Sequence, residues 1–160
     1  MNKRDHVLNA VLLAVGIGVA LDPSLTPTTV SSVVAVGVPV VLGALVPDID
    51  TAVGSHRKTF HNLLTLGVFA AFPLYFGNLQ FVWAGVLTHY ALDLLGNVRG
   101  MALFYPYPVE FDVPVGVPVD SRWATLVTLA VTAVELAVVA GIAYGFIVVD
   151  FSAVTGLLPA

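Results

Sequence analysis

Seven side chains in this chain have the types and the spacing of ligands for divalent metal ions. They are four histidines and three aspartates: His6, Asp48, Asp50, His56, His61, His89 and Asp93. Imidazole nitrogen and carboxylate oxygen are common protein donors for zinc and manganese. Each of the seven falls where an apolar stretch begins or ends. If successive stretches cross a membrane in opposite directions, these positions come to the same membrane face. The sequence therefore predicts a shared polar site at one membrane surface.

Two of these aspartates follow an apolar stretch that ends at Pro47. A proline disfavours helical geometry in the residue before it, so we expect Asp48 and Asp50 on an irregular turn, where both can face one ion. The alternative is that one of them caps the next helix by accepting backbone N–H groups. The turn alone does not decide between the two roles.

The histidines add weight to metal binding. His56 and His61 lie five residues apart at the mouth of the next apolar stretch, and His89 and Asp93 are spaced to share one face of a helix. A single histidine such as His89 is typical of a hydrogen-bonded packing residue. Four histidines at one interface favour ligation, because burying so many ionisable groups near lipid is costly unless they bind or pair.

The number of ligands suggests catalysis. Seven exceed the three protein ligands of a single catalytic zinc, so we expect one or two divalent ions, with zinc or manganese favoured. Asp50 is the candidate bridge between two ions, and a metal-activated water would attack a phosphoryl or acyl centre. Arg57 offers a planar cation for a substrate oxygen, or alternatively an anchor among lipid headgroups. The candidate catalytic residues are therefore Asp50 and Arg57.

The motifs resemble those of a known family. Leu-Val-Pro-Asp-Ile-Asp at 45–50, His-Arg with Thr-Phe-His at 56–61 and His-x-x-x-Asp at 89–93 resemble the YdjM family of membrane-bound, predicted metal-dependent hydrolases. The resemblance covers roughly residues 4–108 and implies a multi-spanning hydrolase whose functional positions are the seven ligands and Arg57. Asn62 departs from the pattern, which usually has serine there. The last apolar stretch lies beyond the resemblance.

The elements that position these residues are expected to be membrane helices. Apolar residues make up 58% of the chain and charged residues only 10%, against about 25% charged in soluble domains. We expect an all-α, multi-spanning bundle that forms one integral membrane domain over residues 1–160. Five spans are expected, at about 7–21, 29–46, 63–76, 79–95 and 124–149. Only the last clearly exceeds the ~20 residues that cross the hydrocarbon, so the others must recruit flanking residues, thin the bilayer or re-enter it.

The basic residues predict the orientation. With the spans as drawn, all six fall on one side: Lys3, Arg4, Arg57, Lys58, Arg99 and Arg122. The positive-inside rule makes that side cytoplasmic, so the N-terminus and the metal site are expected at the inner face of the cell membrane. The alternative for the N-terminus is a cleaved signal peptide, although no small-x-small cleavage site follows.

The same composition limits the partners. A net charge of −4 with no basic stripe argues against nucleic-acid binding. The expected partners are the lipid bilayer and a lipid or other amphiphilic substrate, and the sequence indicates no oligomeric state.

Two further features bear on function. The irregular segment 96–122 is expected to cover the site as an extended or hairpin-like loop, or else to be a solvated connector. Glu135 lies deep in the last span, where Thr128 and Thr132 are its expected hydrogen-bond partners. Three functions remain open: a metal-dependent hydrolase acting on a phosphoester or ester, a non-catalytic protein stabilised by metal, and a small ion transporter that uses Glu135.

Overall fold

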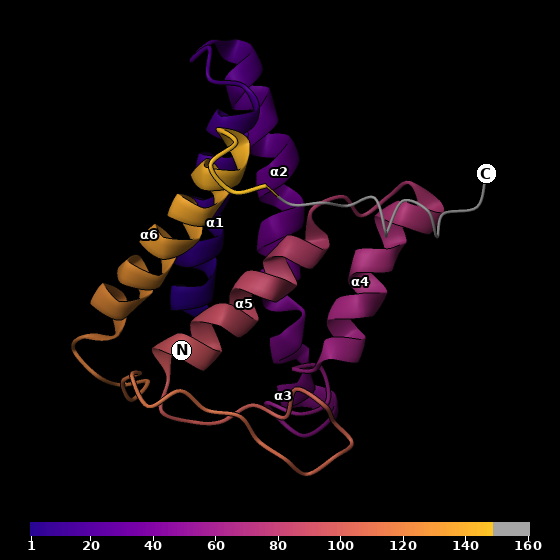
Figure 1. Cartoon of the computed structure of the whole chain (residues 1–160). Coiled ribbons are helices and arrows are strands. Elements are labelled where there is room, and N and C mark those ends of the chain that lie inside the picture. Colours follow the sequence, from indigo (N-terminus) through magenta and orange to yellow (C-terminus); the bar gives the residue numbers. More distant parts are fainter. Residues whose placement is uncertain (149–160) are drawn as a thin grey trace.

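The structure is a computed structural model that describes residues 1–148, and within that range the chain is helical without a strand (Figure 1). Its elements are α1 (Lys3–Leu21), α2 (Pro27–Leu45), the short 3-10 helix η1 (Pro47–Ile49), α3 (Asp50–Val53), α4 (Leu63–Phe76), α5 (Val82–Gly96) and α6 (Ala124–Ala143). The predicted all-α membrane bundle with one long irregular loop is confirmed.

The predicted number of spans is wrong. Three helical segments are long and apolar enough to cross a membrane: Lys3–Leu21, Pro27–Val53 and Ala124–Ala143. The apolar helix α4 has 14 residues and spans about 21 Å, short of the ~30 Å of hydrocarbon. Helix α5 begins only at Val82, because Leu79 and Phe81 have positive φ angles and belong to the turn. The last helix ends at Ala143, and the expected end of its span at Val149 lies outside the described residues.

Helices α1 and α2 run side by side and form the longest part of the bundle (Figure 1). Their contact surface is built from small and β-branched side chains: Ala10, Ala14, Val36, Val40 and Ala44 are all buried. The opposite face of α2 carries an exposed apolar stripe of Val30, Val34, Val38 and Leu42 at four-residue spacing. Such a stripe on the outside of a bundle is what a lipid-facing helix requires.

Helix α5 crosses α2 at close range. A Cβ atom added to Gly43 would lie 2.0 Å from the carbonyl oxygen of Val82, and one added to Gly85 would lie 2.0 Å from that of Val40. The two glycines therefore let the backbones touch, as small residues do between membrane helices. This contact brings the end of α2 against the middle of α5, where His89 lies.

The segment between α5 and α6 closes one end of the bundle (Figure 1). It contains two isolated β-bridges, Asn97 with Val117 and Met101 with Phe111. It is also tied to the turn before α4, because Ala102 N donates to Arg57 O and Leu63 N donates to Leu103 O. The expected loop therefore covers the end of the bundle at which α3 lies.

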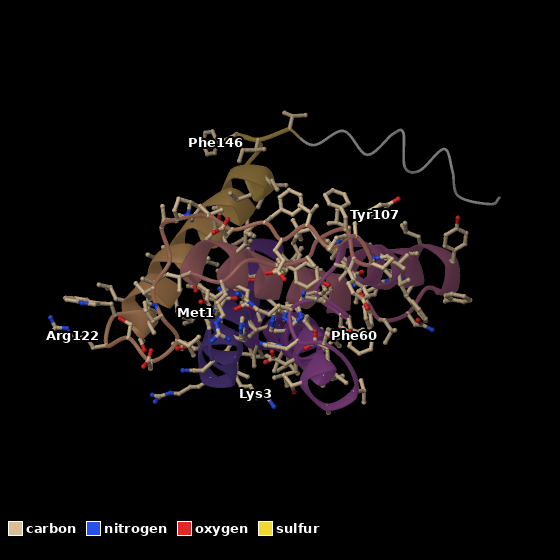
Figure 2. All side chains as sticks on the ribbon, turned by 90° about the horizontal axis from the view of Figure 1, so that it is seen from below. Met1, Lys3, Phe60, Tyr107, Arg122 and Phe146 are labelled. Atoms are coloured by element: carbon tan, nitrogen blue, oxygen red, sulfur yellow. The ribbon has the colours of Figure 1, made fainter. Side chains whose placement is uncertain are left out.

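The basic residues also lie at this end of the bundle. Lys3 starts α1, Arg57 and Lys58 lie in the turn before α4, and Arg99 and Arg122 lie in the segment after α5. Figure 2 looks at the bundle from that end, where the labelled Lys3 and Arg122 extend outward. The turn between α1 and α2, at the other end, has no basic residue.

This polarity predicts the topology. A single cysteine at Lys58 or Ser121 should react with an impermeant thiol reagent only from the cytoplasmic side, and one at Ser24 only from outside, because the positive-inside rule predicts a cytoplasmic basic end. Labelling in intact cells and in inverted vesicles measures this, and the natural chain provides a clean background because it has no cysteine. Labelling of Lys58→Cys in intact cells would reverse the orientation.

Candidate metal centre

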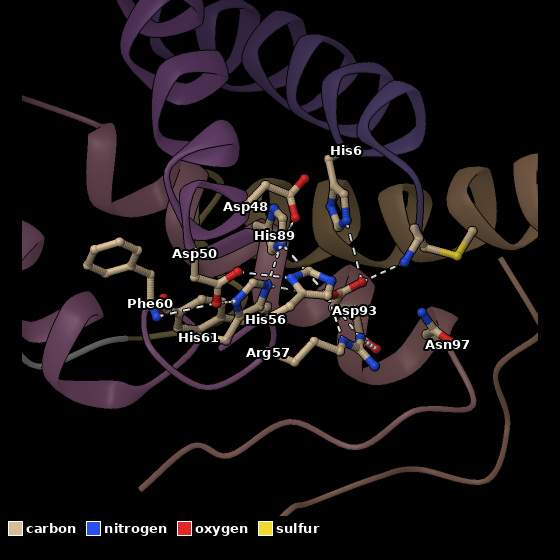
Figure 3. A network of polar contacts seen from close by, with 12 residues as sticks. His6, Asp48, Asp50, His56, Arg57, Phe60, His61, His89, Asp93 and Asn97 are labelled. Carbon is tan, nitrogen blue, oxygen red and sulfur yellow. Dashed lines mark hydrogen bonds and ion pairs between the residues drawn. The ribbon is translucent and has the colours of Figure 1, made fainter. Parts of the chain in front are cut away.

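The structure brings all seven predicted ligands to the closed end of the bundle (Figure 3). His6 comes from α1, Asp48 from η1, Asp50 from α3, His56 and His61 from the turn before α4, His89 from the middle of α5 and Asp93 from its last turn. Four separate segments of the chain thus converge, and their helical packing sets the positions of the side chains.

Asp50 lies behind two imidazole rings. Its Oδ1 is 2.9 Å from His56 Nδ1, its Oδ2 is 2.8 Å from His61 Nδ1, and the carboxylate is fully buried. The alternative role as a helix cap is not observed, since neither Asp48 nor Asp50 makes a side-chain cap hydrogen bond. The carboxylate therefore orients two histidines so that their Nε2 atoms face away from it.

His61 and His89 point their other nitrogens at one another. Nδ1 of His61 faces the Asp50 carboxylate, and Nδ1 of His89 lies 2.7 Å from the carbonyl oxygen of Ala44. Both oxygens accept hydrogen bonds, so each Nδ1 carries the proton and each neutral ring has a bare Nε2. The two Nε2 atoms are 3.1 Å apart. Two lone pairs repel at this distance, so the arrangement requires either a proton on one Nε2, which would then donate to the other, or a metal ion beside both.

The separation of these nitrogens suits a metal. Two nitrogens bound to one tetrahedral zinc, each ~2.05 Å from it, lie about 3.3 Å apart. Asp93 Oδ2 completes a triangle at 3.6 Å from His61 Nε2 and 3.8 Å from His89 Nε2. Burial lowers the pKa of the His61 imidazole, although the neighbouring Asp50 carboxylate opposes the shift. Burial thus favours the neutral ring, which is the form that binds metals.

His6 extends the cluster along α1. Its ring stacks on His89 with centroids 3.6 Å apart, and its Nε2 lies 3.4 Å from Asp93 Oδ1. Both ring nitrogens are buried, and neither has a hydrogen-bond partner in the described structure. A buried imidazole without partners is costly, and a bound ion would satisfy one of its nitrogens.

Six of the seven residues form two groups that could hold a metal ion, and Asp50 belongs to neither. One is His6, His89 and Asp93, and the other is Asp48, His56 and His61; within each group the ligand atoms lie within 4.8 Å of one another. The first group is wholly buried. The second opens outward, because the His56 side chain is 44% exposed.

Arg57 is turned toward Asp93. Its Nη2 lies 2.8 Å from Asp93 Oδ2, its Nε donates to the same oxygen at 3.2 Å, and Nη2 also donates to the Asp93 carbonyl oxygen. Nη1 donates to the Arg99 carbonyl oxygen. With φ at 65°, the Arg57 backbone adopts a left-handed conformation that a non-glycine residue rarely takes. The side chain is buried, and these contacts use most of its donors.

Sequence reasoning missed two residues that shape the site. The Tyr90 hydroxyl accepts from Asn62 N and donates to the Phe60 carbonyl oxygen, which holds the turn that carries His61. Asn62 caps α4 by accepting from Thr65 N at 2.9 Å. Tyr90 follows His89 directly, so its place on the same helix as a ligand was the available signal. Asn62 precedes an apolar run, which is typical of a helix cap.

Fold and site together define a helical membrane protein with a histidine- and aspartate-rich centre at one end of its bundle. The family model of the YdjM inner membrane protein matches residues 1–157, so the chain belongs to this family. The match includes α6 and Glu135, which the motifs alone did not reach. No curated protein and no solved structure matches the chain.

The Arg57–Asp93 pair predicts a large effect on stability. Arg57→Ala should lower the free energy of unfolding by about 3–5 kcal/mol, because it leaves a buried carboxylate without its guanidinium. Arg57→Lys should fall between wild type and Arg57→Ala, since it keeps the charge but loses the planar set of donors. Denaturation of the protein in detergent micelles measures both.

The matched control is Arg122→Ala. That guanidinium is exposed and lies 5.0 Å from the ring centroid of Trp123. Its loss should cost about 1 kcal/mol or less. Equal losses for Arg57→Ala and Arg122→Ala would show that the buried pair contributes nothing.

Proposed function

We propose that this protein is a membrane-embedded, metal-dependent hydrolase that cleaves a phosphoester or ester at the cytoplasmic surface of the cell membrane. One observation carries the proposal: the Nε2 atoms of His61 and His89 lie 3.1 Å apart beside Asp93, which is close to the separation of two nitrogens on one zinc ion. A divalent ion held by such ligands lowers the pKa of a bound water and so supplies a nucleophile at neutral pH. Zinc or manganese fits the mixed nitrogen and oxygen donors.

The seven residues would have two kinds of role, as metal ligands and as a support for those ligands. His61 and His89 would share an ion if only one is bound. If two are bound, His6, His89 and Asp93 would hold one, and Asp48, His56 and His61 the second. Asp50 would not bind an ion itself but would hold two of the histidine ligands, because both of its oxygens face imidazole Nδ1 atoms. A carboxylate in this position fixes the tautomer of a ligating histidine and raises its basicity. This role replaces the bridging position that spacing suggested for Asp50.

The opening of the site to solvent favours a catalytic metal site over a purely structural one. Structural sites are closed by their ligands, whereas catalytic sites keep a position open. The exposed His56 opens onto a cavity of about 380 Å³ lined by His56, Arg57, Arg99, Gly100 and Glu110. A phosphate or carboxylate group could enter there beside the exposed Arg99, while Arg57 stays engaged with Asp93.

An apolar groove beside the site supports an amphiphilic substrate. It measures about 650 Å³ and is lined largely by Val46, Ile49, Phe60, Leu64, Val68 and Phe69. Ile49 lies between Asp48 and Asp50, and Phe60 precedes His61, so the groove adjoins the ligands. An acyl or isoprenoid chain in this groove would leave its polar head at the metal ligands. The lipid bilayer would then supply the substrate directly.

Hydrolysis should depend on the metal and on Asp50. Activity of the purified protein, measured with phosphomonoester, phosphodiester and carboxylic ester substrates, should vanish on chelation and return when zinc or manganese is added. Asp50→Asn should reduce that activity about 10–100-fold, because the amide no longer accepts from both imidazoles.

The control for this change is Asp112→Asn, the same substitution at an exposed position of the loop. It should retain wild-type activity. Turnover that survives chelation undiminished, or equal losses for Asp50→Asn and Asp112→Asn, would refute the mechanism. Full metal occupancy without activity on any substrate of the panel would favour a non-catalytic role.

The two groups of ligands predict two ions. Metal analysis of the purified protein should find about two equivalents, the usual count of a paired metal site. His6→Ala and His56→Ala should each remove about one equivalent, because each removes a ligand from a different group. A wild-type protein with one equivalent that either variant abolishes would mean that the residues share a single ion.

A further inference from the structure

A second polar cluster lies inside the bundle, away from the metal ligands. Asn9 of α1, Thr88 of α5, and Thr132 and Glu135 of α6 meet there. Asn9, Thr88 and Thr132 are fully or almost fully buried, and Glu135 is half-buried. The expected partners of Glu135 differ from those observed, because Thr128 donates to Ala124 O and Thr132 to Thr128 O.

Four short contacts connect the cluster. Thr88 Oγ lies 2.6 Å from both Asn9 Oδ1 and Glu135 Oε1. Asn9 Nδ2 lies 2.6 Å from Glu135 Oε2 and 2.9 Å from Thr132 Oγ. The amide supplies two protons for its two contacts, but the Thr88 hydroxyl has one proton for two acceptors. One contact therefore lacks a proton unless Glu135 carries it on Oε1.

Turning the Asn9 amide over does not remove this requirement. The nitrogen would then donate to Thr88 Oγ, which donates to Glu135 Oε1, while the Thr132 hydroxyl, which already donates to Thr128 O, would face the amide oxygen. That oxygen would lie 2.6 Å from Glu135 Oε2, and two acceptors cannot share a contact of this length without a proton. Both orientations need one more proton than the ionised cluster has.

The surroundings also favour a neutral acid. Among the described residues, the recorded partners of Glu135 are the uncharged Asn9 and Thr88, and no basic group forms an ion pair with it. The titratable side chains closest in sequence to Asn9 and Thr88 are His6, three residues before Asn9 on α1, and His89, directly after Thr88 on α5. Neither makes a recorded contact with Glu135. Glu135 lies near the middle of the membrane span α6, where an ionised carboxylate is costly.

We propose that Glu135 is held as a neutral carboxylic acid whose proton completes a hydrogen-bond cluster joining α1, α5 and α6, and that this cluster positions His6 and His89. Asn9 lies on the same helix as His6, and Thr88 on the same helix as His89. Hydrogen bonds that hold Asn9 and Thr88 in place therefore also hold the two stacked imidazole rings in place. Glu135 is therefore a positioning residue and not an ion-carrying one. The proposal does not depend on hydrolysis.

Infrared spectroscopy tests the proton directly. A difference spectrum of wild type minus Glu135→Gln at neutral pH should show the carbonyl band of a protonated carboxylic acid in the wild type. The amide can donate to Thr88 and accept from Asn9, so Glu135→Gln should match wild type in melting temperature and zinc affinity. Glu135→Leu should lower the melting temperature by about 5 °C and weaken zinc binding, because it strands Asn9 and Thr88.

The control is Thr125→Ala, a polar deletion at an exposed position of α6 that should change neither quantity. A wild-type spectrum with only an ionised carboxylate band at Glu135 would overturn the proposal. Equal damage from Glu135→Gln and Glu135→Leu would do the same. A Glu135→Leu variant with unchanged melting and zinc affinity would remove the positioning role, whatever the spectrum shows.

Discussion

The buried Asp93 carboxylate is the group on which the closed end of the bundle depends. A charge at this depth must be paired, because leaving it alone would cost a large fraction of the stability of a typical domain. Arg57 from the turn before α4 and the amino group of Met1 both contact it. Arg57 in turn binds the Arg99 carbonyl oxygen in the segment after α5. One carboxylate therefore draws together α1, α5 and both irregular segments.

The bundle contains two buried polar clusters, and their polar groups are satisfied in different ways. At the closed end, imidazoles and carboxylates outnumber the hydrogen-bond partners available to them, as the unpartnered His6 nitrogens and the facing nitrogens of His61 and His89 illustrate. That surplus is the chemical basis for the proposed metal binding. Around Glu135 each contact has a partner once a single proton is added. The contrast indicates why one cluster suits an ion and the other a neutral acid.

The sequence predicted that the seven candidate ligands come together, and the structure places them together. Most of them lie beside the ends of apolar stretches, so an alternating path through a membrane brings them to one side. Other features depend on contacts between distant segments. The bond from His89 to the Ala44 carbonyl oxygen exists because Gly43 and Gly85 let α2 and α5 touch. The partners of Glu135 lie on α1 and α5, whereas local spacing favoured threonines of its own helix. The span count failed at Leu79 and Phe81, whose positive φ angles delay the start of α5.

Helix α4 differs from the other long helices because none of its residues is buried. It forms one wall of the apolar groove, with Leu64, Val68 and Phe69 on the lining side, and it stands apart from α1, α2 and α6 in Figure 1. Its inner end is held by Asn62 and Tyr90, while its outer end joins a turn at Gly77. The inner end is therefore the end fixed by side-chain hydrogen bonds next to His61. Because the wall formed by α4 has no buried residue, lipid would reach it along its whole length, and the bilayer itself would form part of the surface that a hydrocarbon chain in the groove meets.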